Sequence, residues 1–216
     1  ITDEIKRRIK IIGTRYKLDF VITEIGGTVG DIESLPYIEA VRQLKRDLGY
    51  ERSLVIHLTL VPYLAASGEL KTKPTQHSVK LLLENGVQPD IMVLRTEYDL
   101  TDEVRKKVAL FCNVNREAVV QSINLPTIYE VPMVMQREKL DKTVLKILNL
   151  NYEGEADLAQ WSSFLEKIKK PGHNVKIGLI GKYVELPDAY KSISESFVHS
   201  GAINNAQVAI EWIHSE

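Results

Sequence analysis

Two short stretches of this chain carry side chains suited to binding a nucleotide. In residues 19–34, which read DFVITEIGGTVGDIES, an apolar run is followed by glycines and by Asp31 and Glu33. The β-branched and aromatic run predicts a buried strand that ends in a tight turn, with Glu24 at its end. Ligands of open α/β sheets bind outside the carboxyl ends of the strands. Glu24 is therefore a candidate ligand for Mg²⁺ carried in with nucleotide phosphates.

The glycines of this stretch form neither of two common phosphate-binding motifs. A Walker A loop has a Lys-Ser/Thr pair after its last glycine, whereas Asp31 follows Gly30. A dinucleotide-binding loop reads Gly-x-Gly-x-x-Gly, but Gly26 and Gly27 are adjacent. Two interpretations stay open at this point. The turn brings its backbone N–H groups close to a ligand, or it is an ordinary strand–turn–helix connection with solvated acids.

The second stretch is a long connection over residues 61–74 that ends in basic residues. Connections of this length without structure of their own are usually functional or disordered. Lys71 and Lys73 flank a threonine, and Pro74 fixes the backbone before Thr75, which is predicted to cap a helix running to residue 85. Two ammonium groups beside a helix N-terminus suit a triphosphate, while a solvated basic loop is the alternative.

Three blocks of the sequence resemble CTP synthases, the glutamine-dependent enzymes that aminate UTP. They are EIGGTVGDIESLPYIEAVRQ at 24–43, GELKTKPTQHSV at 68–79 and IGLIGKYVELPDAYKSI at 177–193. The third block is similar to the start of the glutaminase half of these enzymes. The resemblance runs over essentially the whole chain, but the chain does not cover the whole family protein.

The resemblance implies an α/β fold in two parts. Residues 1–170 would form a parallel-sheet, P-loop-type amidoligase domain that resembles dethiobiotin synthetase and lacks its N-terminal part. Residues 171–216 would form the first βαβ unit of a class I glutamine amidotransferase domain, truncated at its C-terminus. In the family reaction of pyrimidine biosynthesis, ATP phosphorylates the 4-oxygen of UTP, and ammonia released from glutamine replaces it to give CTP.

The resemblance also implies roles for particular residues and partners. Glu24 would be among the Mg²⁺ ligands, and Leu125 would lie near the ATP base. A further set would bind UTP and the feedback inhibitor CTP: Asp31, Ile32, Glu33, Lys71, Thr72, Lys73, Pro74, Thr75, Gln76 and Lys107. GTP is implied as an effector, and a homotetramer is implied whose interfaces bind the pyrimidine nucleotides.

Neither catalytic centre is complete in this chain, which is therefore expected to be inactive alone. No Walker A loop occurs, and the similar run ending in Lys182 is too short and continues with Tyr183. Cys112 has no flanking glycines and is expected to be structural rather than a glutaminase nucleophile. The alternatives are another amidoligase of the same superfamily or a non-catalytic nucleotide-binding or polymer-forming module. A triphosphate acceptor explains the clustered lysines better than a small carboxylate acceptor does.

Hydrophobic periodicity and turn residues predict an alternating order of helices and strands. Parallel pairing and helices on both faces of the sheet follow from that alternation. His57, within a strand, is expected to be a satisfied core histidine rather than a metal ligand. Helices are expected at 2–12 with Thr2 and Asp3 as its cap, 35–48, 75–85, 102–111 capped by Thr101, 139–148, 156–168 and 187–200. Strands are expected at 20–25, 53–60, 91–95, 118–123, 175–180 and 208–213, with residues 127–138 irregular and 169–174 a linker.

Composition narrows the class of protein and its partners. The chain has 216 residues, of which 44% are hydrophobic, as in ordinary globular proteins. A net charge of −1 gives no reason to expect nucleic acid or an acidic membrane as a partner. The single cysteine and the lack of a long apolar run fit a reducing, cytoplasmic location. The chain starts at Ile1 without a leader and is expected to be a segment of a longer protein.

Overall fold

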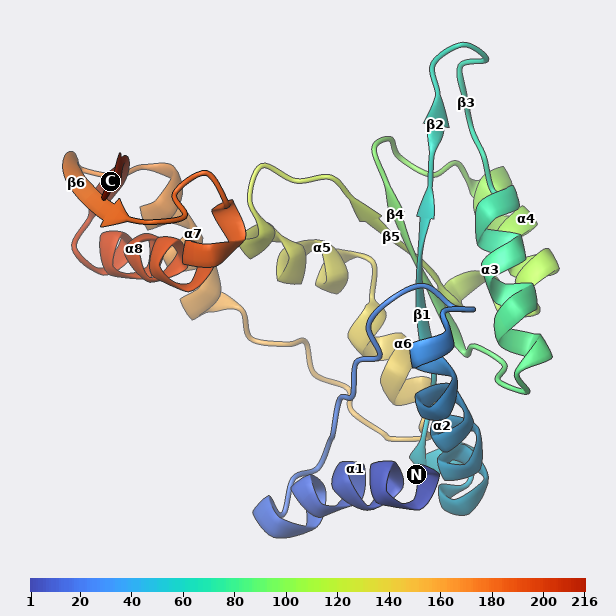
Figure 1. The fold of residues 1–216 in the computed structure, drawn as a ribbon. Coiled ribbons are helices and arrows are strands. Elements are labelled where there is room, and N and C mark those ends of the chain that lie inside the picture. The colour runs from blue at the N-terminus through green and yellow to red at the C-terminus, as the bar shows by residue number, and fades with distance from the viewer. The chain divides into compact units, whose positions relative to one another are not determined.

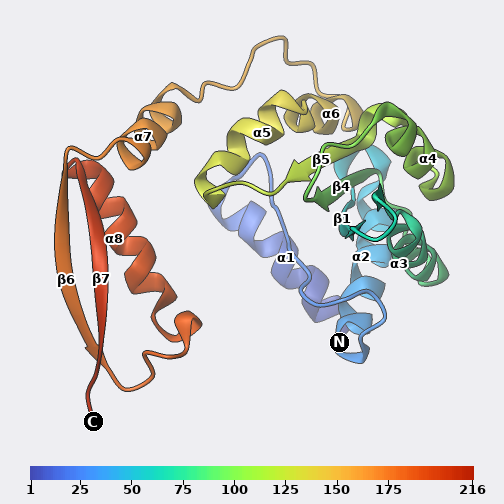
Figure 2. The same ribbon diagram turned by 90° about the horizontal axis from the view of Figure 1, so that it is seen from above.

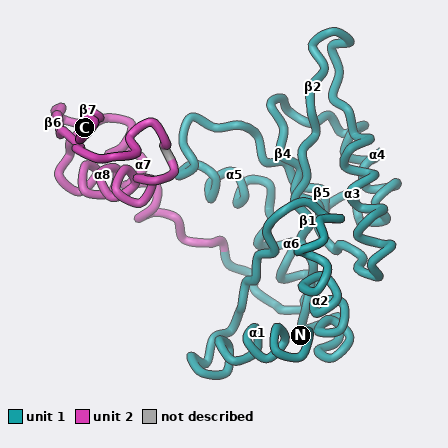
Figure 3. Tube along the Cα trace, viewed as in Figure 1, with its two compact units in different colours: residues 1–154 teal, residues 155–216 magenta. Residues whose placement is uncertain are grey.

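The computed structural model describes residues 1–186 and 188–216, which form two compact units (Figure 1). The units comprise residues 1–154 and 155–216, as Figure 3 shows by colour. The boundary precedes α7 (Ala159–Lys169), a helix that the sequence interpretation assigns to the first domain. Within the described residues, no helix is both long enough and apolar enough to cross a bilayer.

Between residues 35 and 123, the first unit alternates helices with the strands of its main sheet, as predicted. Its helices are α1 (Thr2–Tyr16), α2 (Leu35–Leu48), α3 (Lys73–Glu84), α4 (Asp102–Cys112), α5 (Val131–Arg137) and α6 (Leu140–Ile147). Its strands are β1 (Ile56–Val61), β2 (Tyr63–Leu64), β3 (Glu69–Leu70), β4 (Ile91–Thr96) and β5 (Val119–Ile123).

The main sheet is parallel, in the order β1-β4-β5. Val61, Thr96 and Ile123 stand in register at the ends of the three strands. The carboxyl ends of the strands therefore meet at one edge, where ligands of open α/β sheets bind. The prediction of parallel pairing is confirmed.

Helices cover both faces of this sheet, as expected (Figure 2). On one face, Met92 and Leu94 of β4 pack in a cluster with residues of α3 and α4. On the other, Ile91 and Val93 pack against apolar side chains of α5 and α6. Burial on two faces explains why β4 is a continuous apolar run rather than an alternating one.

Local end signals predict two of the helices well. The structure confirms α2 at residues 35–48, where Gly49 takes a φ of +83° that an L residue rarely adopts. Thr101 caps α4, because its hydroxyl accepts the Val104 N–H at 3.3 Å. In α1 the predicted cap and end are wrong: Ile1 occupies the N-cap position without a side-chain hydrogen bond, and the helix continues to Tyr16.

The predicted buried strand at residues 20–25 is wrong. These residues are coil between α1 and α2, and Ile22 is 95% exposed (Figure 1). A β-branched sequence becomes a strand only when a neighbouring strand completes its hydrogen-bond ladder. Among the described residues, no strand pairs with this segment, so Glu24 does not lie at a strand end.

Two other segments contain more structure than predicted. The connection at 61–74 is not structureless, because β2 and β3 pair in it as an antiparallel hairpin. Residues 127–138, predicted to be irregular, contain α5. Pro132 stands in the first turn of that helix, where proline is tolerated, and Val134 packs its buried side chain inward. Pro132 therefore marks the start of α5 and does not interrupt a helix.

The second unit contains one parallel strand pair and two packed helices. Strands β6 (His173–Gly181) and β7 (Ala206–His214) pair in parallel, with α8 (Lys191–Ile203) between them in sequence. The predicted linker is short, because α7 ends at Lys169 and β6 begins at His173. The predicted helix start at Pro187 lies outside the described residues. Phe164 of α7 packs edge-on against His199 of α8, with ring centroids 5.9 Å apart.

Candidate functional site

Loops from all three main strands begin at the carboxyl edge of the sheet. The β2–β3 hairpin follows β1, and its Tyr63 ring packs 4.2 Å from the ring of Tyr98, which follows β4. The N–H of Asn124 donates to the Thr96 carbonyl at 3.0 Å and so ties the start of the β5 loop to the end of β4. Leu125, half-buried, comes next in that loop. Leu125, the residue that the resemblance places near the ATP base, therefore lies at the carboxyl edge of the sheet.

The β2–β3 hairpin delivers the first predicted phosphate lysine to α3. Leu64 pairs with Glu69 in the hairpin, and the Lys71 N–H donates to the Pro62 carbonyl at 2.9 Å. The Lys71 ammonium forms an ion pair with the Glu69 carboxylate. The hairpin thus fixes the backbone of Lys71 next to the start of α3.

Two further lysines gather around this point from different elements. Lys107 of α4 lies close enough to Glu69 to help lower its pKa, after the larger effect of the Lys71 hydrogen bond. The Lys73 ammonium, in the first turn of α3, lies 5.7 Å from the ring centroid of Phe111 in α4, a cation–π contact. The three predicted phosphate-binding lysines therefore lie on the hairpin, α3 and α4, which pack together.

The threonines of this segment are held inside the protein. The prediction that Thr75 caps the helix is wrong, because α3 begins at Lys73 with Thr72 in the N-cap position. Thr75 is fully buried, and its hydroxyl shares a 3.0 Å hydrogen bond with Thr59 and donates to the Leu60 carbonyl at 3.3 Å. The buried Thr72 hydroxyl accepts Nε2 of Gln76 at 3.0 Å. The Thr75 hydroxyl therefore ties α3 to β1, and the Thr72 hydroxyl stabilises the first turn of α3.

A second polar contact joins the same two elements one helical turn further along. Nε2 of His57 in β1 shares a 2.9 Å hydrogen bond with the Ser78 hydroxyl in α3. His57 is buried, and that burial lowers its pKa. In the described part of the chain, no group of three metal-binding side chains includes it. The prediction of a satisfied core histidine is confirmed.

The acidic glycine turn is built mainly from its own backbone. The Thr28 N–H donates to Oδ2 of Asp31 at 2.8 Å, and the Asp31 N–H donates to the Thr28 carbonyl at 3.0 Å. Gly27 and Gly30 take φ values of +85° and +110°, which the turn requires and which other residues rarely adopt. Glu33 follows, exposed, in a short 3₁₀ turn. The turn therefore leaves Glu33 open to solvent and Asp31 partly buried.

The two predicted halves of the nucleotide site are not in contact in this structure. Val29 packs against the cluster that includes Leu82, so the glycine turn lies beside the far half of α3. Among the described residues, no hydrogen bond or ion pair joins residues 31–33 to residues 71–76. Ile32 is 82% exposed and Glu24 is exposed as well. The acids and the lysines are therefore separate surfaces of one unit.

Comparison with known proteins identifies the family of this chain. Residues 1–150 match the family model described as CTP synthase N-terminus. The chain belongs to the CTP synthase family. Curated proteins named CTP synthase from Cytophaga hutchinsonii and Christiangramia forsetii are each 62% identical to it over 216 residues, and one from Bacteroides fragilis is 58% identical. The chain is covered completely in each comparison and spans 40% of the relatives' length.

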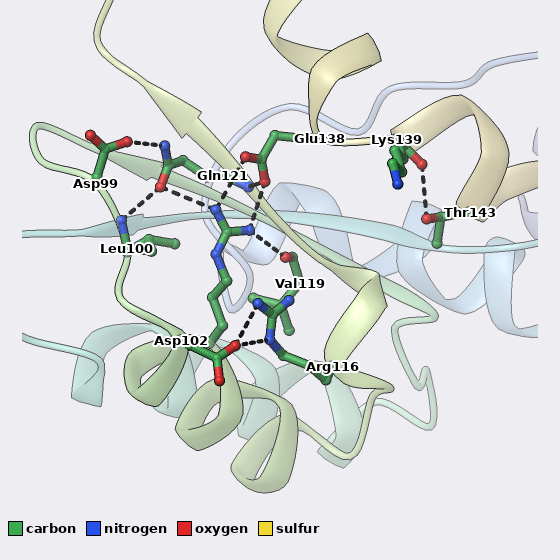
Figure 4. Close-up of polar contacts among 10 residues, drawn as sticks. Asp99, Leu100, Asp102, Arg116, Val119, Gln121, Glu138, Lys139 and Thr143 are labelled. Atoms are coloured by element: carbon green, nitrogen blue, oxygen red, sulfur yellow. Dashed lines mark hydrogen bonds and ion pairs between the residues drawn. The ribbon is translucent and has the colours of Figure 1, made fainter. Parts of the chain in front are cut away.

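A buried polar network in this CTP synthase family member was not predicted from the sequence (Figure 4). Arg105 of α4 donates to both carboxylate oxygens of Glu138, at 2.6 and 3.1 Å, and to the Val119 carbonyl at 3.0 Å. Gln121 of β5 donates its backbone N–H to Glu138 at 3.0 Å, and its side-chain oxygen accepts the Leu100 N–H at 2.7 Å. The available sequence signal for this network was the side-chain amide of Gln121 inside a mostly apolar strand.

The network has a clear electrostatic balance. Burial disfavours the ionised Glu138, but the hydrogen bonds from Arg105 and from the Gln121 backbone outweigh it and hold the pKa of Glu138 below its usual value. Nε2 of Gln121 also donates to Asp99 at 2.6 Å. The network thereby fixes the loop after β4 and the end of α5 to β5, next to the carboxyl edge.

The remaining predicted features lie outside the lysine cluster. Cys112 is buried at the end of α4, and burial raises its pKa to about 11, as expected for a structural thiol. Gly178 and Gly181 lie in β6, not in a phosphate-binding loop. A surface hollow of about 500 Å³ lies at the opposite, amino edge of the sheet, and a second, of about 440 Å³, lies along α1. Neither is lined by a predicted site residue.

Proposed function

We propose that this chain is part of an enzyme that forms CTP from UTP, using ATP and ammonia from glutamine. The observation that carries the proposal is the gathering of Lys71, Lys73 and Lys107 from three elements beside the carboxyl edge of a parallel sheet. Such a cluster suits the triphosphate of a nucleotide. Full-length relatives named CTP synthase support the same reaction.

The proposal extends to the organisation of the complete protein. Residues 1–170 would belong to a P-loop-type amidoligase domain similar to dethiobiotin synthetase, and 171–216 to the start of a class I glutaminase domain. The parallel β6–β7 pair with α8 between its strands supports the second assignment. A cytoplasmic homotetramer with GTP as an effector completes the proposal.

Within the nucleotide site, the side chains divide into contacting and positioning groups. Lys71, Lys73 and Lys107 would contact the phosphates of UTP or CTP, while Asp31 and Glu33 would bind ribose hydroxyls. Because the two groups lie apart in one unit, two copies of the protein would complete the site across an interface. Thr72, Thr75 and Gln76 would shape the first turn of α3, since their polar atoms bond within the protein.

The exposed Glu24 fits a Mg²⁺ ion that arrives with ATP. Magnesium keeps several waters and usually takes one or two protein carboxylates together with phosphate oxygens. A single carboxylate without a hydrogen-bond or ion-pair partner among the described residues meets that requirement. Bound with ATP, the ion would supply neutralisation of the charge that develops in phosphoryl transfer. Glu24 would hold it, and Leu125 would lie near the base.

The complete protein tests this function with ammonia as nitrogen donor. We expect CTP to form from UTP, ATP, Mg²⁺ and ammonium chloride, measured by chromatographic separation of the nucleotides. A small carboxylate acceptor in place of UTP should give no ADP above background. ADP formation with a carboxylate acceptor would instead identify another amidoligase. Tight UTP binding without any turnover would identify a non-catalytic module.

A further inference from the structure

Glu69 is the acid that pairs with Lys71 beside the other two predicted phosphate-binding lysines, and no role was predicted for it from the sequence. It stands in β3, two residues before Lys71, and its carboxylate accepts a hydrogen bond from the Lys71 ammonium. Lys107 of α4 adds a smaller electrostatic attraction to the same carboxylate and helps to lower the pKa of Glu69. The Glu69 carboxylate therefore already pairs with the Lys71 ammonium group, which a phosphate of the ligand would need to contact.

The ion pair is not required to hold the hairpin together. The backbone is fixed by the pairing of Tyr63 with Leu70, the pairing of Leu64 with Glu69, and the bond from the Lys71 N–H to the Pro62 carbonyl. The Glu69 side chain is 54% exposed and that of Lys71 38% exposed, and pairs this open to water contribute little to stability. Removing the carboxylate should leave the fold intact.

We propose that Glu69 competes with the nucleotide phosphates for Lys71 and thereby sets the affinity for UTP and CTP. The inference rests on the proposed function, because it requires Lys71 to contact the phosphates. A phosphate that binds Lys71 must break its pair with Glu69 and must also approach a fixed negative charge. Both effects weaken binding, and both disappear when the carboxylate becomes a neutral amide.

The test compares nucleotide affinities of the complete protein and its Glu69→Gln variant. Calorimetric titration with UTP and with CTP should show about three- to tenfold tighter binding for Glu69→Gln, a modest change because the pair is open to solvent. The matched control is Glu84→Gln, which removes the carboxylate of the exposed Lys80–Glu84 pair at the far end of α3. Its affinities should equal those of the parent. Unchanged or weaker binding by Glu69→Gln would overturn the proposal.

A double-variant cycle separates competition for Lys71 from general repulsion. If Glu69 acts by occupying Lys71, the gain from Glu69→Gln should fall below about twofold in a Lys71→Ala background. A gain that persists undiminished there would overturn the competition. Should Lys71→Ala alone bind UTP as tightly as the parent, the phosphate role of Lys71 in the proposed function fails instead. If Lys71→Ala weakens nucleotide binding but Glu69→Gln does not tighten it, only the proposed role of Glu69 is rejected.

Discussion

The two segments that carry most of the predicted nucleotide-binding residues are built in different ways. Residues 59–78 are tied down: the Thr75 hydroxyl bonds to β1, His57 bonds to Ser78, and the hairpin fixes Lys71. Residues 19–34 are coil and turn, and most of their side chains are exposed. Their hydrogen bonds are short-range contacts such as the one from the Thr28 N–H to Asp31.

This difference separates positioning from chemistry. A lysine cluster on anchored elements is already close to the geometry that a triphosphate needs, so ligand binding orders little. An exposed carboxylate on coil acquires its geometry from whatever it contacts, such as metal, nucleotide or another part of the protein. We therefore expect substitutions of the lysines in the basic segment to change nucleotide affinity, and substitution of Glu24 in the acidic segment to change the reaction itself.

Glu24→Ala in the complete protein should have the largest effect. Loss of a metal-linked contact at a phosphoryl-transfer centre should lower CTP formation roughly a thousandfold, with ammonia as well as with glutamine. Glutamine hydrolysis should stay largely intact, which a glutamate-release assay measures in parallel. Near-normal synthesis with ammonia would show that Glu24 is a bystander.

The basic segment should respond through binding. Lys71→Ala and Lys107→Ala should each weaken UTP and CTP together by roughly ten- to a hundredfold, the scale of one charge-assisted contact. Equilibrium binding of the two nucleotides to the complete protein measures this. Lys80→Ala, on the exposed far part of α3, is the control and should bind normally. A loss confined to one of the two nucleotides would contradict a shared triphosphate site.

Two substitutions, each of which removes one side-chain hydrogen-bonding group, test the difference in anchoring directly. Thr75→Val leaves the Thr59 hydroxyl and the Leu60 carbonyl without a buried partner, so protection of α3 amides from hydrogen exchange should fall about tenfold. Asp31→Ala removes a bond whose donor lies in an exposed turn, where water can replace the carboxylate. Its effect on exchange should be under about twofold at the same α3 amides. Equal effects would contradict the difference in anchoring.

The smallest expected effect is a pH dependence of stability through His57. Its pKa in the folded protein lies below the unfolded value, so as pH falls the unfolded chain takes up a proton that the folded one does not. Stability should therefore decrease as pH falls from about 7.5 to about 5.5, through the ordinary histidine pKa. His57→Gln should reduce this decrease in thermal midpoint, while His77→Gln, exposed on α3, should not. A parent midpoint unaffected by pH in this range would contradict the prediction.

The sequence was sufficient where structure depends on neighbours along the chain. The cap at Thr101 and the end of α2 at Gly49 were readable because a helix end is satisfied by residues within one turn. The apolar run of β4 predicted a strand, and the alternation of helices and strands predicted helices on both faces of its sheet. The lysine-rich motif, likewise, was visible from residue types and spacing alone.

Tertiary structure decided the features that depend on distant partners. Residues 20–25 have the composition of a strand but lie as coil, because a strand also needs a ladder from another segment. Thr75 looked like a helix cap, yet it anchors α3, because β1 presents a hydroxyl and a carbonyl beneath it. Lys107 helps to lower the pKa of Glu69 only because the fold brings α4 near the hairpin. Such contacts join residues far apart in sequence, and their hydrogen bonds and charges leave no periodic signal along the chain.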